Sequence, residues 1–343
     1  MTFTRHAALT IAIFSGMSVS VLAQGSQNPD QPVARISGVL LTLGELEARE
    51  SGKLLQAQYQ YYLSERKVLE EAIDNRLLEN QAVKRQMSLD KFLEAEVYKD
   101  IKDPTEDQLK VYYEGLDTQE PYESVRGDVL QHIRDLRRTK ARAAYVDNLR
   151  KTAQINILLE SPTANVNTSN AYAQGDKRAP VVVVEFADYQ CPYCQKVNPQ
   201  IQQLKKEFGD KLTLIYKDFP LPMHASSQKA AEASRCAGEQ GKFWEYHDVL
   251  FYSKLLGPDD LRDHARVLKL DTDRFDRCLD NGTEAEAVKS DLREAKDLGL
   301  TGTPSFFVNG HFFSGVIDYQ ALKDIINQQL NAVAAKQQML SKK

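Results

Sequence analysis

The chain has 343 residues, of which 27% are charged and 42% hydrophobic, and this ordinary globular mixture excludes collagen-like, low-complexity and wholly disordered proteins. The net charge of −4 predicts no general attraction to nucleic acid, so no nucleic-acid partner is expected. A mean hydropathy of −0.47 argues against a protein with many membrane spans. Four cysteines are too few for a disulfide-built scaffold, so we expect each to have a specific task.

Residues 1–23 have the pattern of a secretory signal peptide. Arg5 and His6 precede an apolar stretch that begins at Ala7 and contains no acidic residue. Val21 and Ala23 supply the aliphatic and small side chains expected at positions −3 and −1 of a signal-peptidase site. Polar residues interrupt the stretch, which disfavours the alternative of an uncleaved membrane anchor. We therefore predict cleavage near Ala23 and a periplasmic protein, in an oxidising compartment.

Residues 24–160 are predicted to form a mainly helical domain. A hairpin that turns at Ser37-Gly38 is expected over Val33–Leu41, before the helices. After them, the alternation of Ile155, Ile157 and Leu159 predicts one strand. Residues that favour N-caps indicate where helices begin, and the expected caps are Thr42, Ser88 and Thr105. The longest helix is expected at about Tyr122–Thr152.

Basic residues crowd the longest of these helices and allow two interpretations. They could form a patch for an anionic partner, or they could be an ordinary solvated helix face. The second interpretation is favoured because an acidic residue, Asp135, lies among them. The residues concerned are Arg134, Arg137, Arg138, Lys140 and Arg142.

The helical half resembles the N-terminal chaperone domain of SurA-type peptidyl-prolyl isomerases over about residues 33–160. The resemblance lies in the opening around Gly38 to Leu46, a Leu-rich helix, and the string P-T-E-D-Q-L-K-V-Y-Y from Pro104. It implies binding of substrate chains or pairing of subunits. No parvulin catalytic domain follows, so prolyl isomerase activity is not expected. Residues 161–180, rich in small and polar residues, are predicted to be a linker.

A Cys-x-x-Cys motif follows a predicted buried strand. Val181–Phe186 is a β-branched run typical of a strand covered on both faces. Cys191 and Cys194 come next, at the start of a helix whose apolar side includes Val197 and Ile201. A helix N-terminus favours negative charge, which lowers the pKa of a thiol and favours the reactive thiolate. Structural zinc is disfavoured because the other cysteines do not form a second ligand pair.

The later elements follow the order of a thioredoxin fold. Leu212–Phe219 predicts a second strand, Pro304 and the Asn309-Gly310 turn predict a hairpin, and Tyr319–Val333 predicts the last helix. A helical insertion occupies about residues 224–300. Its histidines lack the spacing of metal ligands, so surface or capping roles are expected for His224, His247 and His264, with a core role for Phe243, Trp244, Tyr246 and Phe251.

These blocks identify a resemblance to DsbA-type thiol:disulfide oxidoreductases of the four-cysteine bacterial branch. The matching strings begin at Val181 (V-V-V-V-E-F-A-D-Y-Q-C-P-Y-C), Lys217 (K-D-F-P-L-P-M-H), Arg235 (R-C-A-G-E-Q-G-K-F-W) and Leu298 (L-G-L-T-G-T-P-S-F-F-V-N-G). The resemblance implies an α/β thioredoxin fold with an inserted helical subdomain. We expect it to span residues 181–335, after the mainly α-helical N-terminal domain and before a tail at 336–343.

The resemblance also implies roles for particular residues. Cys191 is the expected exposed nucleophile and Cys194 the buried resolving thiol, while Pro192 and Tyr193 tune their redox potential. Thr303 and Pro304 are expected to form a cis peptide pair that faces the sulfurs and offers its backbone to an extended substrate. Glu185 is expected to be a buried acid that moves the proton of Cys194, although an outward-facing strand residue or a core ion pair is the alternative.

Cys236 and Cys278 are predicted to form a structural disulfide. Both lie in predicted helices of the insertion, and this is the one pairing of three that keeps a working Cys191–Cys194 motif. The alternative is two buried free thiols.

The resulting expectation is a periplasmic enzyme that forms, reduces or isomerises disulfides in exported proteins. No cofactor or metal is expected. The expected partners are unfolded or misfolded exported proteins, a membrane redox partner that recycles the site and, through the helical half, a second copy of the chain. The competing hypothesis is a chaperone or holdase in which the thioredoxin domain is secondary. Oxidase, reductase and isomerase activity remain open at this point.

Overall fold

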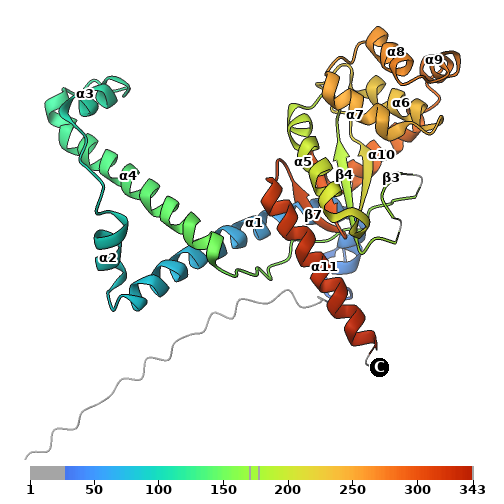
Figure 1. Cartoon of the computed structure of the whole chain (residues 1–343). Helices are drawn as coiled ribbons and strands as arrows, with labels where there is room; N and C mark the ends of the chain where they lie inside the picture. The colour runs from blue at the N-terminus through green and yellow to red at the C-terminus, as the bar shows by residue number, and fades with distance from the viewer. Residues whose placement is uncertain (1–27, 170, 177, 342–343) are drawn as a thin grey trace, which may run out of the picture. The chain divides into compact units, whose positions relative to one another are not determined.

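The computed structural model describes residues 28–169, 171–176 and 178–341 (Figure 1). Two compact units are present, one ending at Ser51 and the other running from Gly52 onward. The predicted signal peptide, including Ala23, lies outside the described residues. Within the described residues, no helix combines the length and the apolar character needed to cross a membrane.

The first unit is a hairpin followed by the start of a long helix. Strands β1 (Pro32–Ile36) and β2 (Val39–Thr42) pair antiparallel around the Ser37-Gly38 turn, as predicted. Thr42 and Glu45 then form reciprocal side-chain to backbone hydrogen bonds of 3.0 and 3.2 Å, which confirms the predicted cap at the start of α1.

The predicted helices of the N-terminal half are confirmed. Ser88 and Thr105 cap α2 and α3 through their side-chain oxygens, and Gln108 completes a capping box with Thr105. A small apolar cluster of Leu78, Phe92 and Val146 holds three of the helical segments together. The elements are α1 (Leu43–Lys84), α2 (Leu89–Phe92), a π-helical turn (Leu93–Val97), α3 (Glu106–Glu114) and α4 (Tyr122–Thr152).

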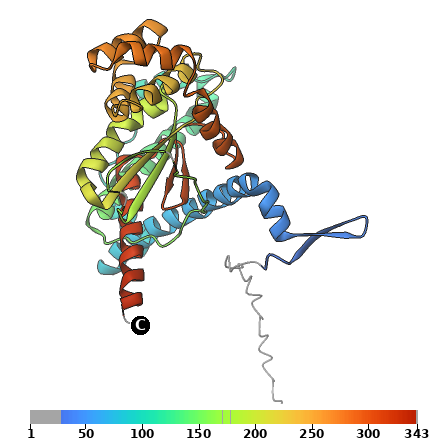
Figure 2. The ribbon, with the colours of Figure 1, turned by 90° about the vertical axis from the view of Figure 1, so that its right-hand side faces the viewer.

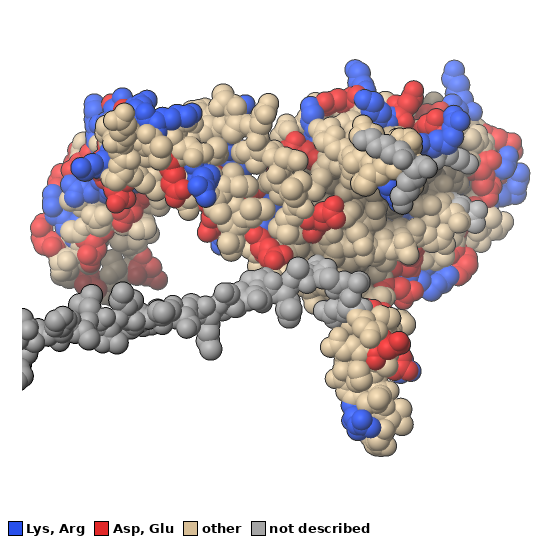
Figure 3. Space-filling model, turned by 90° about the horizontal axis from the view of Figure 1, so that it is seen from below, with Lys and Arg blue, Asp and Glu red and all other residues tan. Residues whose placement is uncertain are grey.

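The basic residues of α4 mostly bind neighbouring helices and turns, which neither sequence interpretation anticipated. Arg134 forms an ion pair with Asp103, and Arg138 forms one with Glu94. Acidic and basic side chains are interspersed on the face seen in Figure 3. The remaining partners are the Lys102 carbonyl and Gln108 for Arg137, and Asn75 for Arg142.

The second unit contains a five-stranded sheet in the order β3-β5-β4-β6-β7. The central strand β4 runs parallel to β5 and antiparallel to β6, and the remaining pairs are antiparallel. With the helices inserted between β5 and β6, this is the predicted thioredoxin fold. The strands are β3 (Tyr172–Gln174), β4 (Val181–Ala187), β5 (Leu212–Asp218), β6 (Ser305–Val308) and β7 (His311–Ser314).

Helices α5 and α11 pack against each other and against the sheet, while α10 packs against β5 and α6 (Figure 1). The insertion is made of α6 to α10, and a disulfide between Cys236 and Cys278 joins α6 to α9. The helices are α5 (Pro192–Phe208), α6 (Ser227–Gly238), α7 (Phe243–Ser253), α8 (Pro258–Val267), α9 (Thr272–Asp280), α10 (Ala285–Asp297) and α11 (Tyr319–Ser341).

Three predicted segments differ in the structure. The alternating residues 155–159 form no strand, because no neighbouring strand pairs with them. The predicted linker 161–180 contains β3, which hydrogen bonds to β5 at the sheet edge. Residues 336–341 of the predicted tail are helical, since α11 continues beyond the sheet to Ser341 (Figures 1 and 2).

Helix α1 contributes to the same apolar core as the thioredoxin sheet. Tyr59 packs edge-on against Phe312 with ring centroids 4.6 Å apart, and its hydroxyl accepts a hydrogen bond of 3.0 Å from the backbone N–H of Ser314. At Gly52 the helix backbone approaches the end of α10 so closely that a Cβ would collide with the backbone around Gly299. Part of the core of the thioredoxin sheet therefore comes from α1, which lies before the domain boundary predicted near residue 160.

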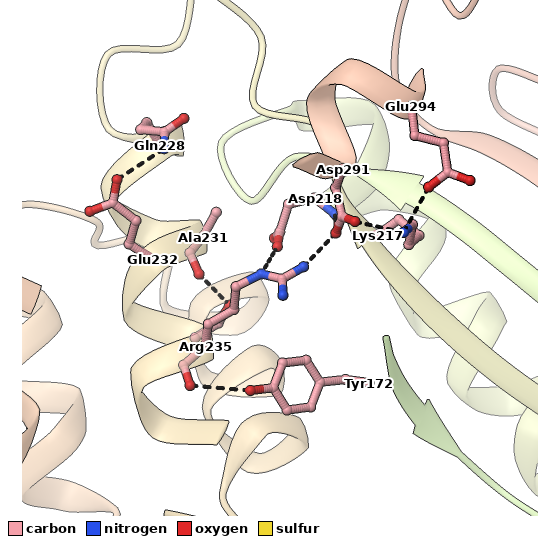
Figure 4. A network of polar contacts seen from close by, with 10 residues as sticks. Tyr172, Lys217, Asp218, Gln228, Ala231, Glu232, Arg235, Asp291 and Glu294 are labelled. Carbon is pink, nitrogen blue, oxygen red and sulfur yellow. Dashed lines mark hydrogen bonds and ion pairs between the residues drawn. The ribbon is translucent and has the colours of Figure 1, made fainter. Parts of the chain in front are cut away.

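A buried ionic network connects the carboxyl end of β5 to α6 and α10 (Figure 4). Lys217 lies 2.6 Å from Asp291 and 2.8 Å from Glu294. Arg235 contacts both Asp218 and Asp291, and burial raises the pKa of Asp218 to about 6 against the influence of that guanidinium. Because each buried charge has an opposite partner, the network avoids the large cost of an isolated buried ion.

Gly52→Ala is expected to lower the free energy of unfolding by about 1–3 kcal/mol, because the new methyl group overpacks a backbone contact. The matched control is Gly127→Ala in α4, where a Cβ meets no atom within 4 Å and alanine should stabilise the helix by up to about 1 kcal/mol. Urea unfolding of both variants measures the difference. Equal stabilities would contradict the packing of α1 on the end of α10.

Candidate functional site

The Cys-x-x-Cys motif lies where the buried strand β4 gives way to α5. Cys191 is the N-cap residue of the helix, and its backbone N–H donates to the Asp188 carbonyl over 3.1 Å. Its own carbonyl accepts from the N–H of Gln195, so the helical hydrogen bonds begin at Cys191. The unpaired N–H groups and the dipole of a 17-residue helix therefore point toward its sulfur.

Both sulfurs are free thiols and both are buried, which corrects the expectation that Cys191 is exposed. Cys191 is 3% exposed and Cys194 is fully buried. The segment before β6 covers Cys191, because the Cys191 Sγ lies 3.5 Å from the carbonyl oxygen of Thr303. Pro192 and Tyr193, between the cysteines, are exposed instead.

The two thiols have opposite pKa shifts. A hydrogen bond from the Cys194 thiol, aided by the Thr303 side chain and the backbone N–H groups of Cys194 and Tyr193, lowers the pKa of Cys191 to about 5 despite its burial. Burial, the hydrogen bond to Cys191 and the charge of Glu185 raise the pKa of Cys194 well above its usual value. Near neutral pH, Cys191 is therefore the thiolate and Cys194 the proton-bearing thiol.

Thr303 and Pro304 are brought to the sulfurs by the pairing of β6 with β4. The peptide bond between them is cis, both residues are buried, and β6 begins directly after them. Cys191 and Thr303 are 112 positions apart in the sequence, so this contact depends on the sheet.

Glu185 is a buried acid on β4, between Tyr216 on β5 and Phe306 on β6 in the strand register. It is 2% exposed, and its Oε1 atom has no hydrogen-bond partner among the described residues. Burial raises the pKa of Glu185 to about 8. These observations exclude an outward-facing residue and place the carboxyl within electrostatic reach of Cys194.

The structure also brings in Asp188, which the sequence analysis did not single out. The Asp188 side chain, which is fully buried, contacts the imidazole of His224 over 2.7 Å. The signal available in the sequence was the position of Asp188, three residues before Cys191. His224 is therefore neither a simple surface residue nor a cap.

His247 was also expected to have a surface or capping role, yet it is 1% exposed inside the aromatic cluster of the insertion. Its ring lies 4.9 Å from those of Tyr216 and Phe251, and burial lowers its pKa. The expectation failed because one of the two rings, that of Tyr216 on β5, comes from a distant part of the sequence. His264 is likewise buried, whereas the predicted core positions of Phe243, Tyr246 and Phe251 are confirmed and Trp244 is partly buried.

Residues 166–328 match the model of the family described as Thioredoxin. Similar solved structures include oxidised BdbD from Bacillus subtilis, which is 26% identical with a TM-score of 0.47 over 50% of this chain and 99% of that one. A thioredoxin-like oxidoreductase from Silicibacter pomeroyi is 30% identical with a TM-score of 0.42 over 48% of this chain and 94% of that one.

Curated relatives match about half of the chain. The Na(+)/H(+) antiporter NhaA 1 of Salinispora arenicola is 38% identical over 159 residues, which are 46% of this chain and 24% of that protein. The Na(+)/H(+) antiporter NhaA of Herminiimonas arsenicoxydans is 33% identical over 177 residues, which are 51% of this chain and 28% of that protein. The chain thus spans about a quarter of the length of these relatives.

Cys191 should alkylate with a midpoint near pH 5, whereas Cys194 should resist alkylation well above pH 9. Cys194→Ala should move the Cys191 midpoint upward, because it removes the hydrogen bond that lowers the pKa most. Iodoacetamide trapping across a pH series, followed by peptide mass mapping, measures both sites. Equal rates at the two sulfurs, or a Cys191 midpoint near the free value of about 8.5, would contradict this assignment.

Glu185 should make the stability of the reduced protein fall between about pH 4 and pH 8. A raised carboxyl pKa means that the folded state keeps a proton that the unfolded state releases, so its contribution is complete below the unfolded pKa and is lost on approaching the folded pKa. Glu185→Gln should remove that part of the pH dependence, and the exposed Glu160→Gln should not. Urea unfolding at pH 5 and pH 8 tests this, and parallel losses in all three proteins would contradict it.

Proposed function

We propose that this protein is a thiol–disulfide oxidoreductase whose redox site is the Cys191–Cys194 pair. The observation that carries the proposal is the opposite shift of two adjacent thiols, with the pKa of Cys191 lowered to about 5 and that of Cys194 raised. Thiolate at one sulfur and a retained proton at the other are what sequential attack on a disulfide requires. The match of residues 166–328 to the Thioredoxin family model supports the same chemistry.

In the proposed reaction, the Cys191 thiolate attacks one sulfur of a partner disulfide. The partner's S–S bond breaks, its second sulfur leaves as a thiolate and takes a proton from solvent, and a mixed disulfide joins Cys191 to the partner. Cys194, having given up its proton, then attacks the Cys191 sulfur, and the partner's first sulfur leaves as a thiolate that also takes a proton from solvent. The Cys191–Cys194 disulfide forms, and the partner gains two electrons. The reverse sequence oxidises a partner dithiol.

Glu185 supplies the proposed acceptor for the proton of Cys194. A carboxylate whose pKa is about 8 is a much stronger base than an exposed glutamate and can exchange protons near neutral pH. Its location between β5 and β6 excludes water, so its protonation is coupled to that of the neighbouring thiol. Proton transfer from Cys194 to Glu185 would give the resolving thiolate.

Thr303 and Pro304 are proposed to receive the partner's chain. The Thr303 carbonyl already lies 3.5 Å from the Cys191 sulfur, and Pro304 has no backbone N–H that would compete for the segment. An extended peptide aligned along this backbone would place its own sulfur beside Cys191. Pro192 and Tyr193 are proposed to tune the potential from the exposed side of the turn.

The proposed partners are unfolded or misfolded exported proteins, and the proposed location is the periplasm. The amino-terminal pattern and the resemblance to DsbA-type enzymes support both proposals. A membrane redox protein is proposed to recycle the pair. The direction of net transfer depends on the potential of the Cys191–Cys194 couple, which separates an oxidase from a reductase or an isomerase.

A holdase function of the helical half is the second candidate, and one feature favours it. An apolar groove of about 420 Å³ lies between α3 and α4, and its lining residues Val111 and Leu136 are exposed. Apolar segments of an unfolded chain, or a second copy of this protein, would suit such a surface. The groove is lined by Asp107, Gln108, Val111, Tyr112, Ile133 and Leu136.

Dithiothreitol-dependent reduction of insulin should be fast with the wild-type protein and reduced to background by Cys191→Ser. Release of the insulin B chain, measured chromatographically, reports the reaction without relying on turbidity, which a holdase would also change. Equilibration with glutathione gives the potential, to be placed between about −120 mV for strong protein oxidants and about −270 mV for protein reductants.

The holdase alternative predicts a different result in the same proteins. Suppression of aggregation of a reduced client should persist in Cys191→Ser and decrease in Val111→Glu and Leu136→Glu, which add charge to the groove. Failure of the wild-type protein to reduce insulin, with suppression intact, would overturn the oxidoreductase proposal in favour of the holdase.

A further inference from the structure

The Asp188 carboxylate is a buried acceptor that receives four hydrogen bonds beside the redox motif. Its side chain is fully buried, and both oxygens have two partners. Such saturation satisfies a buried charge that would otherwise be very costly. The partners are the Gln190 N–H at 2.8 Å and the Ser227 hydroxyl on Oδ1, and the Leu221 N–H at 2.9 Å and the His224 ring at 2.7 Å on Oδ2.

These donors come from two segments on either side of the cysteines. Gln190 belongs to the turn that leads into Cys191, while the other three belong to the loop after β5 and the start of α6. A second link runs in parallel, because the side-chain oxygen of Gln190 accepts from the Ser226 N–H over 2.9 Å. The turn before Cys191 is therefore anchored to a segment about 35 positions away.

His224 is oriented by this carboxylate. Its Nδ1 atom faces Asp188, which requires an Nδ1–H donor, so the Nε2 side of the ring is directed away from the carboxylate. The His224 side chain is 18% exposed, so its ring lies between the buried Asp188 carboxylate and the solvent. A carboxylate that fixes an imidazole in this way stabilises one orientation of both groups.

We propose that Asp188 and His224 form a positioning pair that holds the turn into Cys191 and thereby sets the reactivity of its thiol. The Asp188 carbonyl receives the N–H of Cys191, so a shift of Asp188 moves the first residue of α5 directly. The N–H groups of Tyr193 and Cys194, which support the Cys191 thiolate, depend on that start of the helix. The biological use of this reactivity rests on the proposed function, but the positioning claim concerns the thiol itself.

Asp188→Asn removes a negative charge and also weakens the hydrogen bonds that position the turn, and these two changes should have opposite effects on the reactivity of Cys191. A nearby negative charge disfavours a thiolate, so its loss alone would make Cys191 more reactive. Loss of position would make Cys191 less reactive, because an amide cannot accept from all four donors and the turn would shift. We expect the second effect to prevail and to raise the pKa of Cys191 by about one unit, which lowers the thiolate fraction, and with it the alkylation rate, about fivefold at pH 5.

His224 gives a matched pair of variants that leaves the carboxylate in place. His224→Asn keeps an N–H donor close to the position of Nδ1 and should react like the wild-type protein. His224→Leu removes the donor and should slow Cys191 in the same direction as Asp188→Asn. His311→Leu is the control, because it removes another ring Nδ1 contact, that with the Ser161 carbonyl, away from the cysteines.

The measurement is the rate of Cys191 alkylation across a pH series in the full-length reduced protein, together with its thermal unfolding. Slowing in Asp188→Asn and His224→Leu but not in His224→Asn or His311→Leu would support the proposal. Faster or unchanged alkylation in Asp188→Asn would overturn it. If Asp188→Asn does not fold, the His224 pair decides, and equal rates in His224→Asn and His224→Leu would overturn it. This readout needs no insulin reduction, so failure of the proposed function would be seen separately.

Discussion

The pairing of β4 with β5 on one side and β6 on the other is the constraint on which the site depends. A strand whose consecutive side chains are nearly all buried can occupy only the middle of the sheet. From that position it delivers Glu185 into the core and Cys191 to the helix start, while β6 delivers Thr303 from 112 positions away. The geometry of the site therefore follows from the order of three strands. Without them, neither the turn before Cys191 nor the segment before β6 would keep its position.

Burial and hydrogen bonding then shift the pKa values of the groups that β4 and α5 bring together. The same exclusion of water raises the pKa of Glu185 and of Cys194, because both lose the solvation of their charged forms. Cys191 is almost as buried, yet its pKa is lowered because hydrogen-bond donors surround its sulfur. The difference between the two thiols thus arises from the direction in which N–H and S–H groups point, and Asp188 is one residue that controls this direction.

The long helix α1 and the insertion both strengthen this arrangement from outside the sheet. Tyr59 of α1 covers Phe312 and bonds to the edge strand β7, and the ion pairs around Arg235 hold β5 against the inserted helices. The Cys236–Cys278 disulfide ties two helices of the insertion in a core that also contains Cys191 and Cys194. The N-terminal helical half is accordingly joined to the thioredoxin sheet by side-chain packing as well as by sequence.

The sequence by itself determined the elements whose signals are local. The caps at Thr42, Ser88 and Thr105, the buried run of β4 and the Cys-x-x-Cys motif at a helix start all follow from residues close together in the chain. Only the tertiary structure decided the features that need a distant partner. Residues 155–159 alternate correctly but have no strand beside them, and Tyr216 of β5 packs on the buried ring of His247. The four donors to Asp188 come from the turn before Cys191, the loop after β5 and the start of α6. Even the burial of Cys191 could not be predicted locally, because the group that covers it belongs to the segment before β6, and pairing of strands far apart in sequence has no signature in either strand alone.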